Sequence, residues 1–241
     1  MSYKILIPSY KRAHSQPTIE LLKQAFSRDE IIVSTQTKED YEKYFSRWGD
    51  VATVIFREGS CVGDNRNTLL QWCEENGVGK ALMLDDDISG FRMYTRQTIK
   101  DAHLIRKMFD TCFLTAEKCN AVLWGTYPSN CAPSMSKTVV NNILTGTCFG
   151  ILDTSLRFDP QFRIKEDYEL CLRMMSKRKN VIRFNSFAPN ALHKTAGGCM
   201  DDWEDVARYT KYSQMLCMAY PDFIEPHPNK RGEVRFKKIK K

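Results

Sequence analysis

The sequence has no long apolar run and no paired cysteines. No stretch of its 241 residues approaches the roughly 18 uninterrupted apolar residues that a membrane-spanning helix requires. The amino terminus also lacks the basic and then apolar layout of a secretion signal. Nine cysteines are scattered without a C-x-x-C pair, which favours reduced thiols over a zinc knuckle or a disulfide framework. We therefore expect a soluble, cytoplasmic protein without a membrane partner.

Repeats, linkers and phosphate loops are absent too. The chain contains no internal repeat, no low-complexity linker and no G-x-x-x-x-G-K-S/T loop, so a phosphoryl-transfer enzyme built on such a loop is disfavoured. A chain of 241 residues can bury one substantial core. We predict a single domain over residues 1–225, followed by a basic tail over residues 226–241.

Acidic residues are too few to balance the basic ones, and the formal net charge is +7. Residues 229–241 contain seven basic residues and one acidic residue, so they carry most of this excess. Because Lys and Arg supply the affinity for phosphate backbones, a basic tail on a nearly neutral body suits a nucleic-acid partner. The candidate contacts are Lys237 and Lys238 in the tail and Arg178 and Lys179 in a second basic cluster. A solvated terminus and a solvated helix face are the open alternatives.

Apolar periodicity predicts alternating strands and helices. Short apolar runs predict four strands at residues 4–7, 30–34, 51–56 and 80–84, with helical spacing between them at 17–26, 37–48 and 64–76. Further along, we expect helices at 98–118, 166–177 and 201–219 and strands at 121–125, 146–153 and 181–184. This order predicts an α/β fold with a mostly parallel central sheet flanked by helices.

The most informative feature is a buried strand that runs directly into three aspartates at residues 85–87. Acids at the carboxyl edge of an α/β sheet lie where such folds bind ligands. In an extended chain Asp85 and Asp87 share one side, whereas Asp86 faces the other. Two carboxylates on one side can hold a hard divalent cation, or one can bind the ion and the other a sugar hydroxyl. A solvated acidic turn is the alternative.

Three more polar islands accompany the aspartates in a fixed order. They are Ile7-Pro8-Ser9-Tyr10-Lys11-Arg12, Gly63-Asp64-Asn65-Arg66-Asn67 and Lys165-Glu166-Asp167. Over about residues 4 to 200, the ordered set resembles the glycosyltransferases of the GT-A (Rossmann-like) fold, in the manner of the family-two nucleotide-sugar transferases. The closest pattern is that of the TET/JBP-associated glycosyltransferases, which phages use to glycosylate hydroxymethylated pyrimidines in DNA. If the chain is phage-encoded, it would act in the host cytoplasm.

The resemblance implies a donor site after the first strand. The loop there would cup the base and ribose of the nucleotide, where an aromatic ring can stack and a guanidinium can pair with phosphate. The beginning of a helix favours anionic or hydroxyl-rich ligands. The donor-binding candidates are Pro8, Ser9, Tyr10, Arg12, Asn65, Arg66, Asp85, Asp86 and Lys194. An ordinary strand exit and a surface helix cap are the alternatives.

The resemblance also implies a divalent metal, Mn²⁺ or Mg²⁺, with a UDP-sugar as co-substrate. The D-x-D role of the family falls on Asp85 and Asp87, of which Asp87 is the preferred metal ligand. His193 precedes a glycine loop and is a candidate further ligand, and the neighbouring Lys194 is placed to lie over the diphosphate. A purely structural histidine is the alternative.

Glu166 and Asp167 begin a predicted helix, where the helix dipole stabilises a carboxylate. In inverting relatives an acid at this position removes the proton from the acceptor hydroxyl, so Asp167 is the candidate general base and Glu166 the alternate. Acids are favoured at helix starts in any case, which is the structural alternative.

The acceptor region is expected near Trp124 and Tyr127, aromatic residues that can stack on an extruded base, grip a saccharide or lie in the core. We predict a metal-dependent, inverting enzyme that transfers a hexose, with glucose as the favoured sugar, from a UDP-sugar to 5-hydroxymethylcytosine or 5-hydroxymethyluracil in DNA. A saccharide, lipid or protein acceptor is one alternative. A non-catalytic nucleic-acid-binding module is another.

Overall fold

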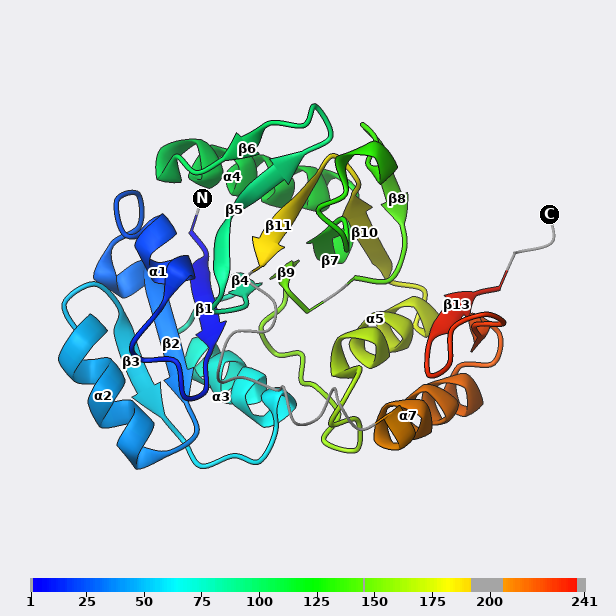
Figure 1. Ribbon diagram of the computed structural model, residues 1–241, viewed down its shortest axis with the longest axis horizontal. Coiled ribbons are helices and arrows are strands. Elements are labelled where there is room, and N and C mark those ends of the chain that lie inside the picture. The colour runs from blue at the N-terminus through cyan, green and yellow to red at the C-terminus, as the bar shows by residue number, and fades with distance from the viewer. Residues whose placement is uncertain (1, 145, 192–205, 238–241) are drawn as a thin grey trace.

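The computed structural model describes residues 2–144, 146–191 and 206–237. Within these residues, eight strands form a central sheet in the order β3-β2-β1-β4-β9-β7-β10-β8 (Figure 1). The bounds of these strands are β1 Lys4–Pro8, β2 Ile31–Thr35, β3 Thr53–Phe56, β4 Ala81–Leu84, β7 Ala121–Thr126, β8 Val139–Asn141, β9 Cys148–Ile151 and β10 Asn180–Phe184.

Strands β1 to β4 form the parallel half of the sheet. β1 pairs in parallel with β2 and β4, and β2 pairs in parallel with β3. The carboxyl ends of all four strands therefore meet at one edge of the sheet. β9 inserts antiparallel between β4 and β7, whereas β10 runs parallel to β7. The prediction of a mostly parallel sheet is confirmed.

Helices cover both faces of this sheet. Their bounds are α1 Pro17–Leu22, α2 Lys38–Trp48, α3 Val62–Glu75, α4 Ala102–Lys118, α5 Glu166–Ser176 and α7 Val206–Ala219, with short 3-10 turns at Arg28–Glu30 and Ala132–Ser134. Because strand side chains alternate, Ile5 and Ile7 pack with α1, α2 and α4, whereas Leu6 packs with α3, α5 and α7. Burial on both faces explains the continuous apolar runs of β1, β2 and β4.

Two smaller sheets complete the described structure. One has the order β11-β5-β6, from β5 Ile88–Met93, β6 Thr98–Ile99 and β11 Phe187–Ala191. The other is the antiparallel hairpin of β12 Ile224–Pro226 and β13 Val234–Phe236. No helix in the described ranges is long and apolar enough to cross a membrane.

Several local predictions need correction. The helix predicted from residue 98 begins at Ala102, because Asp101 caps it by accepting a hydrogen bond from the Leu104 amide at 2.9 Å. The strands β5, β6, β8, β11, β12 and β13 were not predicted, since these short segments lack a clear apolar alternation. Part of the tail predicted from residue 226 forms β13, which pairs with β12. Residues 201–205 of the last predicted helix lie outside the described residues.

Trp124 occupies the core of the sheet layer and is fully buried. Its ring packs edge-on against Phe113 on α4 and Phe184 on β10. Gly150 on β9 lies against the indole, and a Cβ at this position would fall 1.9 Å from Trp124 Nε1. The expected stacking of Trp124 on an acceptor base is therefore wrong for this structure, because the surrounding core excludes any ligand from the ring.

We expect Gly150→Ala to destabilise the protein, because the added methyl group has no space beside Trp124. Overpacking of a core typically costs about 1–3 kcal/mol in the free energy of unfolding, which urea denaturation measures. Gly79→Ala is the matched control, since a Cβ at this position meets no atom within 4 Å. Equal stability of the two variants would contradict the packing described for Trp124.

Candidate active site

The three aspartates follow β4 at the carboxyl edge of the parallel strands, and α1 holds their turn in place. The Thr18 hydroxyl donates to the backbone oxygen of Asp85 at 2.6 Å and accepts from the Ile88 amide at 2.9 Å. The Asp85 amide in turn donates to the backbone oxygen of Thr147 at 3.0 Å. Contacts on both sides therefore fix the acidic turn.

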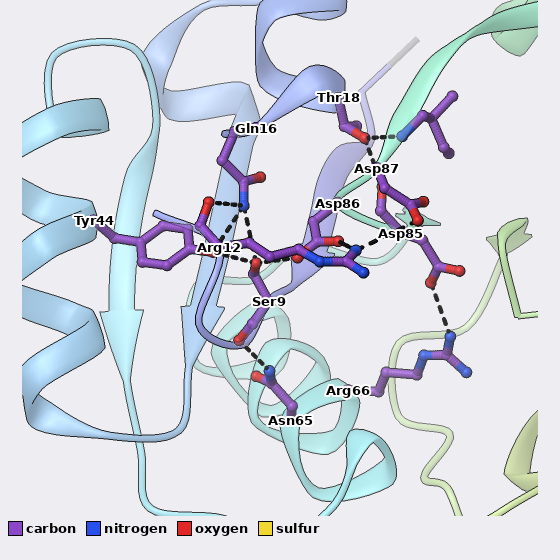
Figure 2. Close-up of polar contacts among 11 residues, drawn as sticks. Ser9, Arg12, Gln16, Thr18, Tyr44, Asn65, Arg66, Asp85, Asp86 and Asp87 are labelled. Carbon is purple, nitrogen blue, oxygen red and sulfur yellow. Dashed lines mark hydrogen bonds and ion pairs between the residues drawn. The ribbon is translucent and has the colours of Figure 1, made fainter. Parts of the chain in front are cut away.

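Asp86 belongs to a buried polar network between β1, α1 and α2. Ser9, which follows β1, donates its hydroxyl to Asp86 and contacts the hydroxyl of Tyr44. Gln16 donates its side-chain amide to Tyr44 at 2.7 Å and to Ser9 at 3.0 Å. Figure 2 shows these side chains gathered around one carboxyl group of the triplet. Ser9 and Asp86 thus shape the loop after β1 from within.

Arg12 connects that loop to two of the three aspartates. Its Nη1 atom donates to Asp86 Oδ1 at 2.5 Å and lies 3.4 Å from Asp87 Oδ2. Asp85 instead pairs with Arg66 (Figure 2). We expected Asp85 and Asp87 to lie on one side of the chain. The ion pairs group the aspartates differently, because the turn that begins after Leu84 places Asp86 and Asp87 around one guanidinium.

Arg66 is the link between the aspartates and the second acidic pair. It extends from the first half of α3 and is almost fully buried. Its Nη2 atom donates to Asp85 Oδ1 at 3.2 Å and to the backbone oxygen of Gly146 at 2.9 Å, and its Nη1 atom donates to Glu166 Oε1 at 2.5 Å. Gly146 has to lack a side chain, because a Cβ would lie 2.5 Å from Arg66 Nη2.

Asp167 lies beside Glu166 in the first turn of α5 and is less deeply buried. Its Oδ2 atom accepts from the Gly146 amide at 2.6 Å, and its Oδ1 atom accepts from the Tyr168 amide at 2.8 Å. Two backbone donors therefore orient this carboxylate. Glu166, by contrast, is committed to Arg66.

Burial changes the proton affinity of these acids. It raises the pKa values of Asp85, Glu166 and Asp167 above the ordinary carboxyl range, and the positive charge of Arg66 opposes the rise. Burial likewise raises the pKa of Asp86, opposed by Arg12. Carboxyl groups with raised pKa values are suited to accept protons near neutral pH.

The remaining donor-site candidates lie at the same edge. Pro8 is the last residue of β1 and is buried. Tyr10 is half-buried, and the Lys11 ammonium lies 4.9 Å from the centre of its ring. Asn65 donates its side-chain amide to the backbone oxygens of Ser9 and Ser34, at 3.2 Å each, and so joins α3 to the ends of β1 and β2.

The acceptor and nucleic-acid candidates are more dispersed. Tyr127 directly follows β7, is half-buried and lies with its ring centre 5.4 Å from the guanidinium carbon of Arg183. Arg178 and Lys179 are exposed after the carboxyl end of α5, opposite the acidic first turn, and Lys237 is exposed after β13. Three more candidates, His193, Lys194 and Lys238, lie outside the described residues.

Four contributing residues were not predicted. They are Gln16, Thr18, Tyr44 and Gly146. Tyr44 has the helical spacing of an apolar core residue, so its hydroxyl contact gives no sequence signal. Gly146, just before β9, is the one of the four that the sequence could have indicated, because a glycine beside a strand often marks a site where another group approaches the backbone closely.

The residues fit a divalent cation only in part. Asp87 Oδ1 is buried without a hydrogen-bond partner among the described residues, so one carboxylate oxygen is available as a ligand. No group of three or more His, Cys, Asp or Glu side chains in the described ranges could hold a metal. A cation here would therefore need ligands beyond the described side chains.

Comparison of this chain with known proteins identifies its family and its fold. The profile of a family described as TET-Associated Glycosyltransferase matches residues 3–198. A TarS structure from S. aureus (residues 1–349) has a TM-score of 0.52 and 12% identity, covering 90% of this chain and 66% of that one. A cytidylyltransferase from Leptospira borgpetersenii has a TM-score of 0.50 and 12% identity, with 91% and 95% covered. These likenesses confirm the GT-A fold alone. No curated protein matches the sequence.

We expect Arg66→Met to lower the free energy of unfolding by about 3–5 kcal/mol, because it leaves a buried carboxylate without its partner. The pKa of Glu166 is already raised in the fold and would rise further. Stability is then lost as pH rises through that pKa, so the deficit should be larger at pH ~8 than at pH ~6.

Urea denaturation at the two pH values measures this difference. Lys43→Met removes an exposed pair with Glu39 on α2 and serves as the control, with little change expected at either pH. A deficit that is the same at both pH values would contradict the role given to Arg66.

Proposed function

The chain belongs to the TET-associated glycosyltransferase family and is a glycosyltransferase, and from this premise we propose that it transfers a hexose from a UDP-sugar to the hydroxymethyl group of a modified pyrimidine in DNA. Glucose is the proposed sugar, and 5-hydroxymethylcytosine or 5-hydroxymethyluracil is the proposed acceptor base. One observation carries the proposal of a catalytic centre: Arg66 joins Asp85 to Glu166, so the aspartate triplet and the α5 acids form one cluster.

The donor would bind at the carboxyl edge of β1 and β4. Tyr10 is half-buried there and offers a ring face for the uracil. Arg12 already lies between Asp86 and Asp87, so its charge is held at the place where a diphosphate and its counter-ion would meet. The buried contacts of Ser9, Gln16 and Tyr44 keep this loop in position before the donor arrives.

Asp87 would hold the divalent cation, using the buried oxygen that has no other partner in the described structure. When bound, Mn²⁺ or Mg²⁺ would neutralise charge that develops on the leaving diphosphate. Arg66 holds one carboxylate oxygen of the nearby Asp85. The other Asp85 oxygen suits a contact with a ribose or sugar hydroxyl. His193 and Lys194 stay predictions for further contacts with the metal and the diphosphate.

Asp167 is the proposed general base. The acceptor hydroxyl would attack the anomeric carbon in line with the departing UDP, with inversion, and its proton would pass to an Asp167 oxygen. The Gly146 and Tyr168 amides orient this carboxylate, and burial raises its pKa above the ordinary carboxyl range. Glu166 would instead hold Arg66 in place, because its contact with that guanidinium occupies it.

Tyr127 is the aromatic residue that we retain for the acceptor side. It is half-buried, and Arg183 lies over its ring, so a base and its phosphate could contact adjacent groups. Arg178, Lys179, Lys237 and Lys238 are proposed to contact the DNA backbone farther from the reacting atoms.

Two substitutions should separate the donor and base roles. We expect Asp167→Asn to lower kcat by about 10²- to 10⁴-fold, because the general base is lost, with little change in UDP affinity. Asp87→Asn should remove turnover and metal dependence together. In the unsubstituted enzyme, kcat should fall as pH falls through the raised pKa of Asp167, since a protonated base cannot accept the proton.

Steady-state kinetics with UDP-glucose and graded Mn²⁺ measures these effects, and calorimetry measures UDP binding. Asp50→Asn, at an exposed position after α2, is the control and should behave as the unsubstituted enzyme. Normal metal-dependent turnover by Asp87→Asn would refute the metal assignment.

The acceptor class is tested directly with oligonucleotides. We expect a mass increase of one hexose on strands that contain 5-hydroxymethylcytosine or 5-hydroxymethyluracil, and none on strands with unmodified pyrimidines, when a panel of nucleotide-sugars is supplied. Lys237→Gln should weaken DNA binding and reduce its salt dependence, because one phosphate contact is lost. Release of UDP without a hexose on any oligonucleotide would refute DNA as the acceptor. It would leave the proposed use of a UDP-sugar donor standing.

A further inference from the structure

Helix α7 and the β12–β13 hairpin lie beyond residues 3–198, the part of the chain that matches the family. They nevertheless pack beside α5, the helix that bears Glu166 and Asp167 (Figure 1). This C-terminal unit, residues 206–237, therefore lies outside the matched range and contacts the helix of the proposed base.

The contact centres on Lys165, the residue directly before α5. Its side chain is only 3% exposed. The ammonium donates to the Tyr209 hydroxyl of α7 at 2.8 Å and to Glu233 Oε2 of the hairpin at 3.2 Å. The Tyr209 hydroxyl donates to Glu233 Oε1 at 3.1 Å, which closes a three-membered cycle. The ammonium also lies 4.0 Å from the centre of the Tyr209 ring.

The backbone at Lys165 is unusual, with φ at 64° in the left-handed region. This conformation is uncommon for a residue with a side chain and persists where surrounding contacts enforce it. It turns the chain sharply into α5, so that the next two residues are the acids of the site. A second tie follows one turn later, where the Tyr220 hydroxyl donates to the buried Glu169 at 2.7 Å.

We propose that Tyr209 and Glu233 are positioning residues that clamp Lys165 and thereby fix the start of α5 with the Asp167 carboxylate directed at the acceptor hydroxyl. This inference rests on the proposed function, since Asp167 is its base. The clamp acts through Lys165 and contacts no substrate.

Charge works in the same direction as geometry. Burial raises the pKa of Asp167. Arg66, the Tyr168 and Gly146 amides and, as a smaller contribution, the Lys165 cation oppose this rise. Burial also lowers the pKa of Lys165, and the Glu233 carboxylate opposes this by stabilising the cation. Loss of Glu233 would remove the carboxylate that holds the Lys165 ammonium in place near Asp167.

The test compares Glu233→Gln and Tyr209→Phe with the control Glu225→Gln. Glu225 pairs with Arg235 within the same hairpin, so its loss changes the hairpin without touching Lys165. For Glu233→Gln we expect kcat about tenfold lower, as suits loss of a charged hydrogen bond, with KM for the UDP-sugar unchanged. The acidic limb of the kcat profile should shift, because the Lys165 ammonium near Asp167 loses its anionic partner. Tyr209→Phe should show a smaller effect, because its ring remains.

Hydrogen exchange gives a readout that does not depend on activity. The Glu169 amide donates to the Lys165 carbonyl at 3.0 Å, so amides at 165–170 should exchange faster in Glu233→Gln and remain slow in Glu225→Gln. If Glu233→Gln matches the control in kcat, pH profile and exchange, the clamp is refuted and the proposed function stands. Equal loss of kcat, donor affinity and melting temperature would also refute it, in favour of general destabilisation. No transfer by the unsubstituted enzyme would refute the proposed function, while exchange would still decide the clamp.

Discussion

The site depends on one buried guanidinium. Arg66 contacts Asp85 after β4, the Gly146 carbonyl before β9 and Glu166 at the start of α5, so three separate chain segments share a single cation. The Glu166 carboxylate is buried and the Asp85 carboxylate is partly buried, and such groups lose hydration that a hydrogen-bonded cation has to replace. Without that cation, Asp85 after β4 and Glu166 at the start of α5 would repel each other.

Much of the fold was readable from the sequence, because its signals are local. The apolar runs of β1 to β4 and the helical spacing between them predicted the parallel half of the sheet and the edge at which the aspartates lie. Asp85 and Glu166 were each chosen for their place at the end of a strand or the start of a helix. Arg66 was predicted to bind the donor, and its contacts with both acids emerge only from the structure.

The remainder depends on contacts between residues far apart in the chain. Trp124 was expected at the acceptor side, but only the packing of β9 and α4 around it shows that it is enclosed. Asp167 and Glu166 are equivalent in sequence and differ in burial and hydrogen bonding. The contact between Ser9 and Tyr44 joins residues whose sequence patterns predicted a loop and an apolar helix face.

The C-terminal hairpin shows that the boundary of a sequence family and the boundary of a cooperative physical unit can differ. Residues 199–241 fall outside the family profile, yet Ile224 and Tyr212 are buried in the same apolar cluster as α3 and α5. A shortened protein that ends at the profile boundary would expose that cluster to water and leave the Lys165 ammonium without Glu233. The segment beyond the profile and the domain within it share one apolar core, so the two are expected to unfold as a single unit.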